Sequence, residues 1–162
     1  MNGKFSFPPI VDQNARILLL GTMPGERSIR MQQYYGHAGN QFWKILFSLF
    51  NEPLSNDYEI RKGLLLRNNI ALWDVLQYCE GKGSADSAIR NEVPNDFSSF
   101  FYSNPKIKHI FLTSKKANAF YDKYIGKSSE KEYYLLPSPS RANTWKNFEK
   151  KLEDWKIILQ YL

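Results

Sequence analysis

The sequence predicts an α/β protein built on a parallel sheet, from three observations along its 162 residues. Four short segments, at 16–20, 69–73, 106–112 and 132–136, have the composition of strands. Segments with helical periodicity separate them, an alternation typical of parallel strands joined by crossover helices. Near the carboxyl end, apolar residues recur three and four positions apart and predict an amphipathic helix that covers the sheet: Trp145, Phe148, Leu152, Trp155, Leu159 and Leu162.

The first strand leads into a loop suited to approaching a ligand. Residues 17–20 are Ile-Leu-Leu-Leu, and residues 21–25 are Gly-Thr-Met-Pro-Gly. The two glycines and the proline let the backbone turn sharply and come close to a bound molecule. Because ligands of open α/β sheets bind beyond the carboxyl ends of the strands, we expect this loop to carry the chemistry.

The segments between the strands carry helix and turn signals. Residues 40–50 are apolar on nearly every side, which predicts a buried helix. Ser114 is suited to capping a further helix, and Gly126 to ending it. The segment 80–84 lacks the spacing of a phosphate-binding loop, so we predict a flexible turn between helices. No repeat or linker marks a second domain, and we expect one domain over 1–162.

Composition limits the class of partner. A net charge of +6 and a pI near 9.3 favour a polyanion without identifying it. Aromatic residues form 15% of the chain, enough for a core and for surfaces on which bases stack. The single cysteine, Cys79, suits a reducing compartment, and with His37 and His109 it is too isolated to predict a zinc site. Without a signal region or a membrane-length segment, the protein is expected in the cytoplasm.

Several motifs in order resemble the uracil-DNA glycosylase superfamily. The segment 21–25 is similar to its first motif, and residues 34–43, Tyr-Tyr-Gly-His-Ala-Gly-Asn-Gln-Phe-Trp, are similar to its hypoxanthine-DNA (deoxyinosine) glycosylase branch. The resemblance continues through 71–76, 83–87 and 136–140, and so covers nearly the whole chain. It implies a three-layer α/β/α sandwich with a central four-stranded parallel sheet. It also implies excision of a deaminated base from DNA, hypoxanthine first and uracil second, that leaves an abasic site.

Such an enzyme must flip the base out of the duplex and stabilise an oxocarbenium-like sugar while the base departs. A polar side chain near the sugar can orient water, and backbone amides can stabilise charge on the base. Neither task needs a metal or a cofactor, so we expect none. No lysine occupies a recognised nucleophile position, which predicts a monofunctional enzyme.

The resemblance gives the catalytic role to Asn40. Many superfamily members position water with the third residue of the first motif, but here that residue is Met23, which cannot do so. In the hypoxanthine branch the asparagine of Asn-x-Phe-Trp is catalytic, and Asn40 holds that position. The alternative for Asn40 is a helix cap, a common use of asparagine.

Six residues are candidates to contact the base. Tyr35 and Phe42 could stack on it, or could be core aromatics; His37 could donate to a purine nitrogen or a phosphate, or could be an ordinary loop residue. Asp74 could accept from N1–H of hypoxanthine or N3–H of uracil, or could cap a helix or pair with a cation. Backbone groups of Thr22 and Met23 could also face the base. Asp86 is expected to be structural.

The loop 137–143 stands where the superfamily has its second motif. The hydroxyls of Ser138 and Ser140 could bind DNA phosphates, and Arg141 could fill the gap left by the flipped base or pair with a phosphate. Leu136 takes the first motif position, so the histidine that many uracil enzymes carry there is missing. The alternative is a proline-stiffened connection from strand to helix.

Two rival functions remain open. A mismatch-specific uracil/thymine-DNA glycosylase shares the Asn-x-Phe-Trp segment, whereas Met23 and Leu136 raise the possibility of a catalytically silent nucleic-acid-binding module. The expected partner is DNA that contains a deaminated base. We expect a monomer that binds no membrane.

Overall fold

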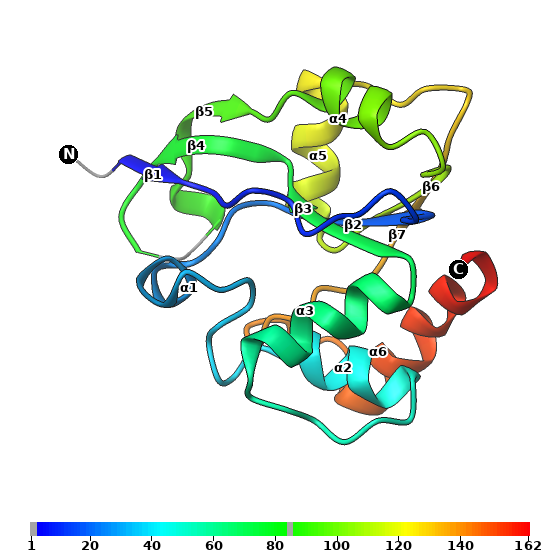
Figure 1. Cartoon of the computed structure of the whole chain (residues 1–162). Coiled ribbons are helices and arrows are strands. Elements are labelled where there is room, and N and C mark those ends of the chain that lie inside the picture. The colour runs from blue at the N-terminus through cyan, green and yellow to red at the C-terminus, as the bar shows by residue number, and fades with distance from the viewer. Residues whose placement is uncertain (1–2, 84–85) are drawn as a thin grey trace.

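The computed structural model describes residues 3–83 and 86–162. Its centre is a parallel sheet of four strands in the order β3-β2-β6-β7 (Figure 1). The strands are β2 (Ile17–Gly21), β3 (Ile70–Asp74), β6 (His109–Leu112) and β7 (Glu132–Leu135). The four-stranded prediction is confirmed. Strand β6 begins later than predicted because the chain is still turning at Ile107, whose N–H donates to the Asn104 carbonyl.

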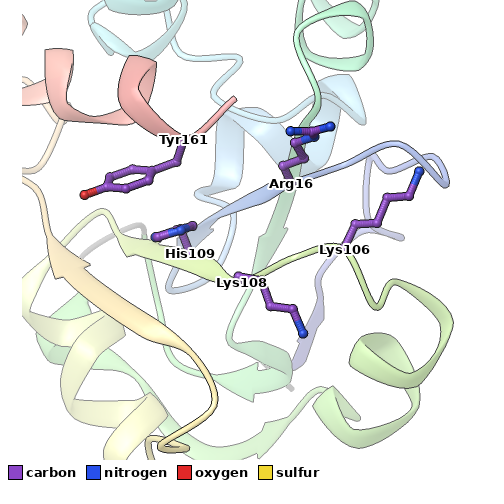
Figure 2. Close-up of a pocket in the computed structure, with 5 residues that line it drawn as sticks. All are labelled: Arg16, Lys106, Lys108, His109 and Tyr161. Atoms are coloured by element: carbon purple, nitrogen blue, oxygen red, sulfur yellow. The ribbon is translucent and has the colours of Figure 1, made fainter.

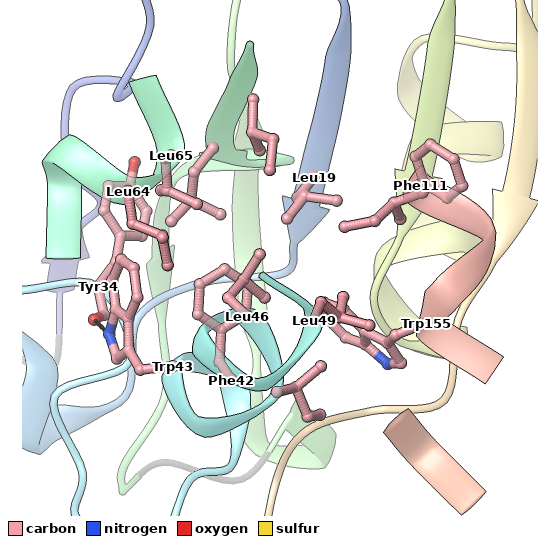
Figure 3. Close-up of a cluster of buried hydrophobic side chains, with 14 of the residues drawn as sticks. Leu19, Tyr34, Phe42, Trp43, Leu46, Leu49, Leu64, Leu65, Phe111 and Trp155 are labelled. Atoms are coloured by element: carbon pink, nitrogen blue, oxygen red, sulfur yellow. Dashed lines mark hydrogen bonds between the residues drawn. The ribbon is translucent and has the colours of Figure 1, made fainter. Parts of the chain in front are cut away.

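Helices cover both faces of this sheet, which confirms the α/β/α sandwich. One layer holds α2 (Phe42–Leu49), α3 (Tyr58–Arg67) and α6 (Phe148–Trp155), and the opposite layer holds α4 (Phe97–Ser103) and α5 (Lys115–Tyr124) (Figure 1). Each layer buries its own apolar cluster against the sheet. Leu19 belongs to the first cluster, shown in Figure 3, whereas Leu18 and Leu20 belong to the second. This alternation follows from the two-residue period of a strand.

A second, antiparallel sheet was not predicted. It contains β1 (Gly3–Phe5), β4 (Leu76–Glu80) and β5 (Arg90–Pro94) in the order β1-β4-β5. The prediction that 80–84 joins helices is wrong, because this segment leaves β4 and leads through the short 3₁₀ turn Asp86–Ala88 into β5. Ser84 lies outside the described residues. Gly81 has φ +141°, and a Cβ there would lie 2.3 Å from the Ala88 carbonyl oxygen, so this turn requires glycine.

The predicted helix ends are found in the structure. Helix α5 begins after Ser114, whose Oγ accepts from the Ala117 N–H at 3.1 Å. Gly126, at φ +84°, donates its N–H to the Tyr121 carbonyl at 2.8 Å as the helix ends. The buried helix expected over 40–50 is α2, and the short α1 (Glu26–Met31) follows the loop after β2.

The carboxyl-terminal helix is shorter than predicted. Helix α6 is capped by Asn147 and passes into a 3₁₀ helix, Lys156–Tyr161. Trp145 precedes the cap and is 93% exposed, so the prediction that it covers the sheet is wrong. Leu159 is also exposed, because the tighter 3₁₀ turn changes the face on which side chains lie. Lys151, which lies between two apolar positions of this helix, is by contrast buried.

No helix within residues 3–83 and 86–162 combines the length and the apolar character needed to cross a membrane. Over the same residues, no group of three or more His, Cys, Asp or Glu side chains is placed to hold a metal ion. The single cysteine, Cys79, is buried in the second apolar cluster.

Candidate functional site

Buried polar side chains gather at the carboxyl ends of three neighbouring strands. Parallel pairing sets Gly21 at the end of β2 opposite Asp74 at the end of β3. Thr113 follows β6 directly, and both its N–H and its hydroxyl donate to the Leu20 carbonyl, at 2.9 and 3.1 Å. Thr22, Asp74 and Thr113 are all buried. Burying polar groups is costly unless they are bonded, so such a cluster at a sheet edge marks a candidate site.

Gly21 allows two side chains to meet over the strand end. A Cβ at this position would lie 2.6 Å from Asp74 Oδ1 and 2.8 Å from the Tyr35 hydroxyl, both too close for a side chain. The Asp74 carboxylate and the Tyr35 phenol therefore occupy the space that a residue other than glycine would fill. The sequence predicted that a ligand would come close to the backbone here. In this structure the groups that come close to Gly21 are side chains of the protein itself.

Tyr35 lies between the strand ends and the core. Its ring stacks on Phe42, with 4.0 Å between centroids and 12° between planes. Its hydroxyl lies 3.3 Å from Thr113 Oγ1, within hydrogen-bonding distance, and the Thr113 hydroxyl also contacts the Leu20 carbonyl. Tyr35 has φ +52°, a left-handed conformation that is uncommon for tyrosine and often marks functional positions.

Phe42 has the environment of a core residue. It is 0% exposed, and its edge contacts include Trp43 and Trp155. Tyr35 is only partly buried and covers one face of Phe42. Of the two aromatic candidates, Tyr35 alone presents surface to a base in this conformation. Base contact by Phe42 stays a prediction that would require Tyr35 to move.

One alternative proposed for Asp74 does not fit the structure. The chain runs from Asp74 through Val75 into β4, so no helix starts here for the carboxylate to cap. The Asp74 carbonyl accepts from Asn95 Nδ2 at 2.8 Å, which anchors the strand end. Burial and, next, the nearby charge of Asp74 raise the pKa of the Tyr34 phenol. A charge on the Asp74 carboxylate therefore acts on neighbouring groups, because a buried setting of low dielectric screens it less than water does.

The groups near Thr22 and Met23 are partly used by the fold. The Thr22 carbonyl accepts from the Leu76 N–H at 3.2 Å, and Thr22 Oγ1 lies 3.2 Å from Ser114 Oγ. Met23 is half-buried and packs against the second apolar cluster. Base contact by the backbone of these two residues remains a prediction.

A turn at 37–40 prepares two polar side chains for a ligand. His37 is exposed, and its Nδ1 accepts from the Gly39 N–H at 2.9 Å. An accepting Nδ1 places the proton of the neutral ring on Nε2, which can then donate outward. The His37 carbonyl accepts from the Asn40 N–H at 2.9 Å and closes the turn.

Asn40 lies one residue before Gln41, the N-cap of α2, but one half of its amide still accepts from a helix N–H, much as a cap does. Its Oδ1 accepts from the Phe42 N–H at 2.9 Å, at the start of α2. Its Nδ2 donates to no atom among residues 3–83 and 86–162, and Asn40 is only half-buried. Capping and catalysis are therefore compatible, because the amide nitrogen is available to a water or a substrate atom.

The loop after β7 lies against this turn. The Gln41 N–H donates to the Pro139 carbonyl at 2.9 Å, which joins the two segments. Ser138 Oγ accepts from the Ser140 N–H, and Ser140 Oγ accepts from the Ala142 N–H, each at 3.2 Å. Because both hydroxyl oxygens already accept from the backbone, their hydrogens are left as donors. Two such donors side by side suit phosphate oxygens.

Arg141 lies beside the His37 turn. A Cβ on Gly39 would lie 2.5 Å from Arg141 Cδ and 3.2 Å from His37 Cε1, so the two side chains flank this glycine. Leu136, by contrast, is buried in the first apolar cluster. The structure thus brings His37, Asn40 and Arg141 together with the serine loop, and places Tyr35 with Asp74 at the strand ends.

Sequence reasoning missed three residues of this region. Thr113 is the first polar residue after the strand predicted at 106–112, which is the signal that marked Asp74. Gln41 and Lys151 are joined by a side-chain hydrogen bond of 2.9 Å. The signal for Lys151 was its position, three residues after Phe148 and four before Trp155, on the apolar face of the helix.

A separate pocket lies at the opposite edge of the sheet. It encloses about 360 Å³ and is lined by Arg16, Lys106, Lys108, His109 and Tyr161 (Figure 2). Arg16 immediately precedes β2 and Lys108 immediately precedes β6, so the pocket is at the amino ends of the strands. None of the predicted site residues lines it, and we do not assign the base to it.

Comparisons with known proteins identify the family. The sequence profile described as Uracil DNA glycosylase superfamily matches residues 8–162. Proteins named hypoxanthine DNA glycosylase include one from Methanosarcina acetivorans, 38% identical over 98% of this chain and 99% of the relative, and one from Methanosarcina barkeri, 40% identical over 86% and 88%.

A solved structure agrees with this assignment. The solution NMR structure of a candidate uracil DNA glycosylase from Methanosarcina acetivorans matches with a TM-score of 0.84 at 35% identity, and covers 98% of this chain and 97% of that chain. The sequence match extends over most of the chain, and the structural match includes both layers of helices. The chain therefore belongs to the uracil-DNA glycosylase superfamily.

Proposed function

We propose that this protein is a monofunctional DNA glycosylase that removes hypoxanthine from deoxyinosine and leaves an abasic site. The observation that supports this most strongly is the match, over nearly the full length of both chains, to a relative named hypoxanthine DNA glycosylase. The geometry agrees with it, because base-contacting and phosphate-contacting candidates lie at one edge of the sheet.

The base would bind at the ends of β2 and β3. A flipped base needs one stacking surface and polar groups that read its edge. Tyr35, which is partly buried and stacks on Phe42, would supply the surface, and the Asp74 carboxylate would supply an acceptor for the N1–H of hypoxanthine. Because Asp74 is buried, a hydrogen bond to it would be stronger than in water.

Bond cleavage would be assisted from the turn at 37–40. The Asn40 amide nitrogen is the candidate to hold the attacking water near C1′ of the sugar. His37 Nε2–H is the candidate to donate to a purine nitrogen, which would stabilise charge as the base leaves. Each group is held by its other hydrogen bond within the turn, so little reorganisation is needed when DNA binds.

The duplex would bind across the serine loop. The Ser138 and Ser140 hydroxyls are the candidate phosphate donors, and Arg141 is the candidate to enter the space left by the flipped nucleotide. Leu136 packs inside the core and so offers no polar group from this motif to a uracil anion. This arrangement favours hypoxanthine over uracil as the main substrate.

A panel of labelled duplexes tests the proposal. Each duplex carries one inosine, one uracil, a G·T mismatch or no lesion, and is treated with alkali after incubation to cleave abasic sites. We expect cleavage of the inosine strand first, and only after alkali. A preference for G·U and G·T would favour the mismatch-specific alternative, and binding without release of any base would support a silent module.

The proposal includes three further properties. We propose one glycosylase domain over 1–162, a monomeric enzyme, and action in the cytoplasm, where the expected DNA substrate and reducing conditions coincide. The single domain is supported by a family match that extends from residue 8 to residue 162. Size-exclusion chromatography with light scattering would test the oligomeric state.

A further inference from the structure

Lys151 is a buried cation at the centre of the proposed site's framework. Lys151 is 1% exposed, whereas its neighbour Lys150, the other lysine of α6, is exposed to solvent. Lys151 Nζ donates to Gln41 Oε1 at 2.9 Å and to the Ser140 carbonyl at 3.2 Å. Within residues 3–83 and 86–162, no carboxylate forms an ion pair with it. Burial lowers the pKa of this ammonium group.

The two acceptors of Lys151 belong to the two halves of the site. Gln41 follows Asn40 directly, and Ser140 is a candidate phosphate contact. The same halves are also joined by the Gln41 N–H, which donates to the Pro139 carbonyl. Trp155, one turn further along α6, donates its indole N–H to the Pro137 carbonyl at 3.0 Å. Helix α6 therefore holds both the turn at 37–41 and the loop at 137–140.

Stability alone does not explain a lysine at this position. Removing an ammonium ion from water costs several kcal/mol, and two neutral acceptors offset only part of that cost. Phe148, Leu152 and Trp155 show that this face of α6 otherwise packs apolar side chains against the core. Local rules of folding are most often broken where function requires it.

We propose that Lys151 is a positioning residue for base excision, which holds the Asn40 turn and the Ser138–Ser140 loop at a fixed separation before DNA binds. This inference rests on the proposed function. An error of about 1 Å in the placement of catalytic groups can slow an enzyme about a hundredfold. Positioning by Lys151 would therefore affect the rate of the chemical step more than the affinity for DNA.

The first test compares Lys151→Met with Lys150→Met, an exposed lysine on the same helix. Excision is measured in single turnover with enzyme in excess, on whichever lesion the wild-type protein removes. For Lys151→Met we expect a rate at least tenfold lower, with a melting temperature equal to or above that of wild type, because methionine removes the buried charge. For Lys150→Met we expect the wild-type rate.

Two other outcomes would overturn the proposal. A lower melting temperature with an unchanged excision rate would make Lys151 merely structural. A shallower dependence of duplex affinity on salt would make it a direct phosphate contact. Lys151→Gln serves as the conservative variant and should recover part of the rate, since its amide can still donate. If neither variant folded, the positioning role would also be rejected.

A double-mutant cycle and hydrogen exchange test whether Lys151 acts through Gln41. If Lys151 acts through Gln41, Gln41→Ala and Lys151→Met together should slow excision no more than the stronger single change does. Hydrogen exchange at the Gln41 amide, which donates to Pro139, should be at least tenfold faster in Lys151→Met than in wild type. This measurement needs no substrate, so inactivity of the wild-type protein on inosine would refute the proposed function without deciding this inference.

Discussion

The ring of Tyr35 lies flat against the fully buried ring of Phe42, with 4.0 Å between their centroids. One face of Tyr35 is thus packed on the core, while its hydroxyl contacts Thr113 at the end of a central strand. A ring held in this way has little freedom left to lose when a base stacks on it. Its position therefore suits a preformed stacking surface.

Replacing Tyr35 with alanine should slow excision about tenfold to a hundredfold, because stacking on an aromatic ring contributes about 1–3 kcal/mol per base. Tyr35→Phe keeps the stack and removes the hydroxyl with its contact to Thr113, so its excision rate should fall less than that of Tyr35→Ala. Tyr102→Ala, at an exposed tyrosine on α4, is the control. Wild-type rates for Tyr35→Ala in single-turnover assays would contradict a stacking role.

Asn40→Ser separates capping from catalysis. Serine can still accept from the Phe42 N–H, as Asn40 Oδ1 does, but it has no amide nitrogen. We expect normal folding by circular dichroism, normal duplex binding, and excision at least a hundredfold slower. Asn40→Ala should lose the rate and also about 1 kcal/mol of stability, the usual contribution of a cap. Normal turnover by a folded Asn40→Ser enzyme would leave Asn40 as a cap only.

Gly21→Ala should damage both the fold and the site. The added methyl would lie 2.6 Å from Asp74 Oδ1 and 2.8 Å from the Tyr35 hydroxyl, so one of them must move. We expect a loss of about 1–3 kcal/mol in the free energy of unfolding, together with slower excision.

Gly63→Ala is the matched control for Gly21→Ala. It lies on α3, where the nearest atom to the new Cβ is Arg67 Nη1 at 3.9 Å. It should stabilise the protein by about 0.5–1 kcal/mol, since alanine favours helix over glycine. Denaturant unfolding of both variants measures the difference. Equal stability and full activity of Gly21→Ala would show that Asp74 and Tyr35 do not need their observed positions.

The parallel sheet could be predicted because its strands are covered on both faces. Residues 17–20 and 70–73 are then apolar at every position, a pattern that stands out in the sequence. Strands β4 and β5 have mixed buried and exposed positions, polar residues and register shifts, so no simple alternation marked them. Trp145 misled the helix prediction because an aromatic residue fits the apolar spacing whether or not the helix has begun.

The candidate site was predictable where short motifs carry it. Asn40, Asp74 and the serine loop lie in segments whose order along the chain resembles the family, and the sheet brings their ends together. Lys151 could not be assigned in this way, because its burial depends on Gln41, which is 110 residues away in sequence. A lysine at a helical position is usually solvated, and only the tertiary partners decide otherwise.

Excision should proceed at the same rate in EDTA as in buffer with magnesium. Hydrolysis of the glycosidic bond by the proposed groups needs only water, a hydrogen-bonding pocket and stabilisation of charge. Duplex affinity should nevertheless fall steeply with salt, with a log–log slope of about −0.9 for each phosphate contacted. Purified protein assayed with and without EDTA at constant ionic strength makes the comparison. Loss of excision in EDTA, restored by magnesium, would contradict the expected chemistry.

Arg141→Ala should distinguish a wedge from a phosphate clamp. The Arg141 side chain lies beside Gly39 and His37, next to the turn that carries Asn40. If Arg141 fills the space left by the flipped base, it offsets part of an unstacking cost of a few kcal/mol. Its loss should then slow excision from duplex DNA more than from single strands, where the base is already unstacked.

Single-turnover rates on both substrates at two salt concentrations decide between the two roles of Arg141. A wedge predicts a loss confined mainly to the duplex, with an almost unchanged salt dependence. A phosphate clamp predicts that the excision rate falls equally on both substrates, and that the log–log slope of its salt dependence becomes shallower by about one. Arg30→Ala, an exposed arginine on α1, controls for a general effect of net charge. Arg141 lies beside the turn that carries Asn40. We expect the first result, because under the proposed function the flipped nucleotide would leave the duplex at this turn.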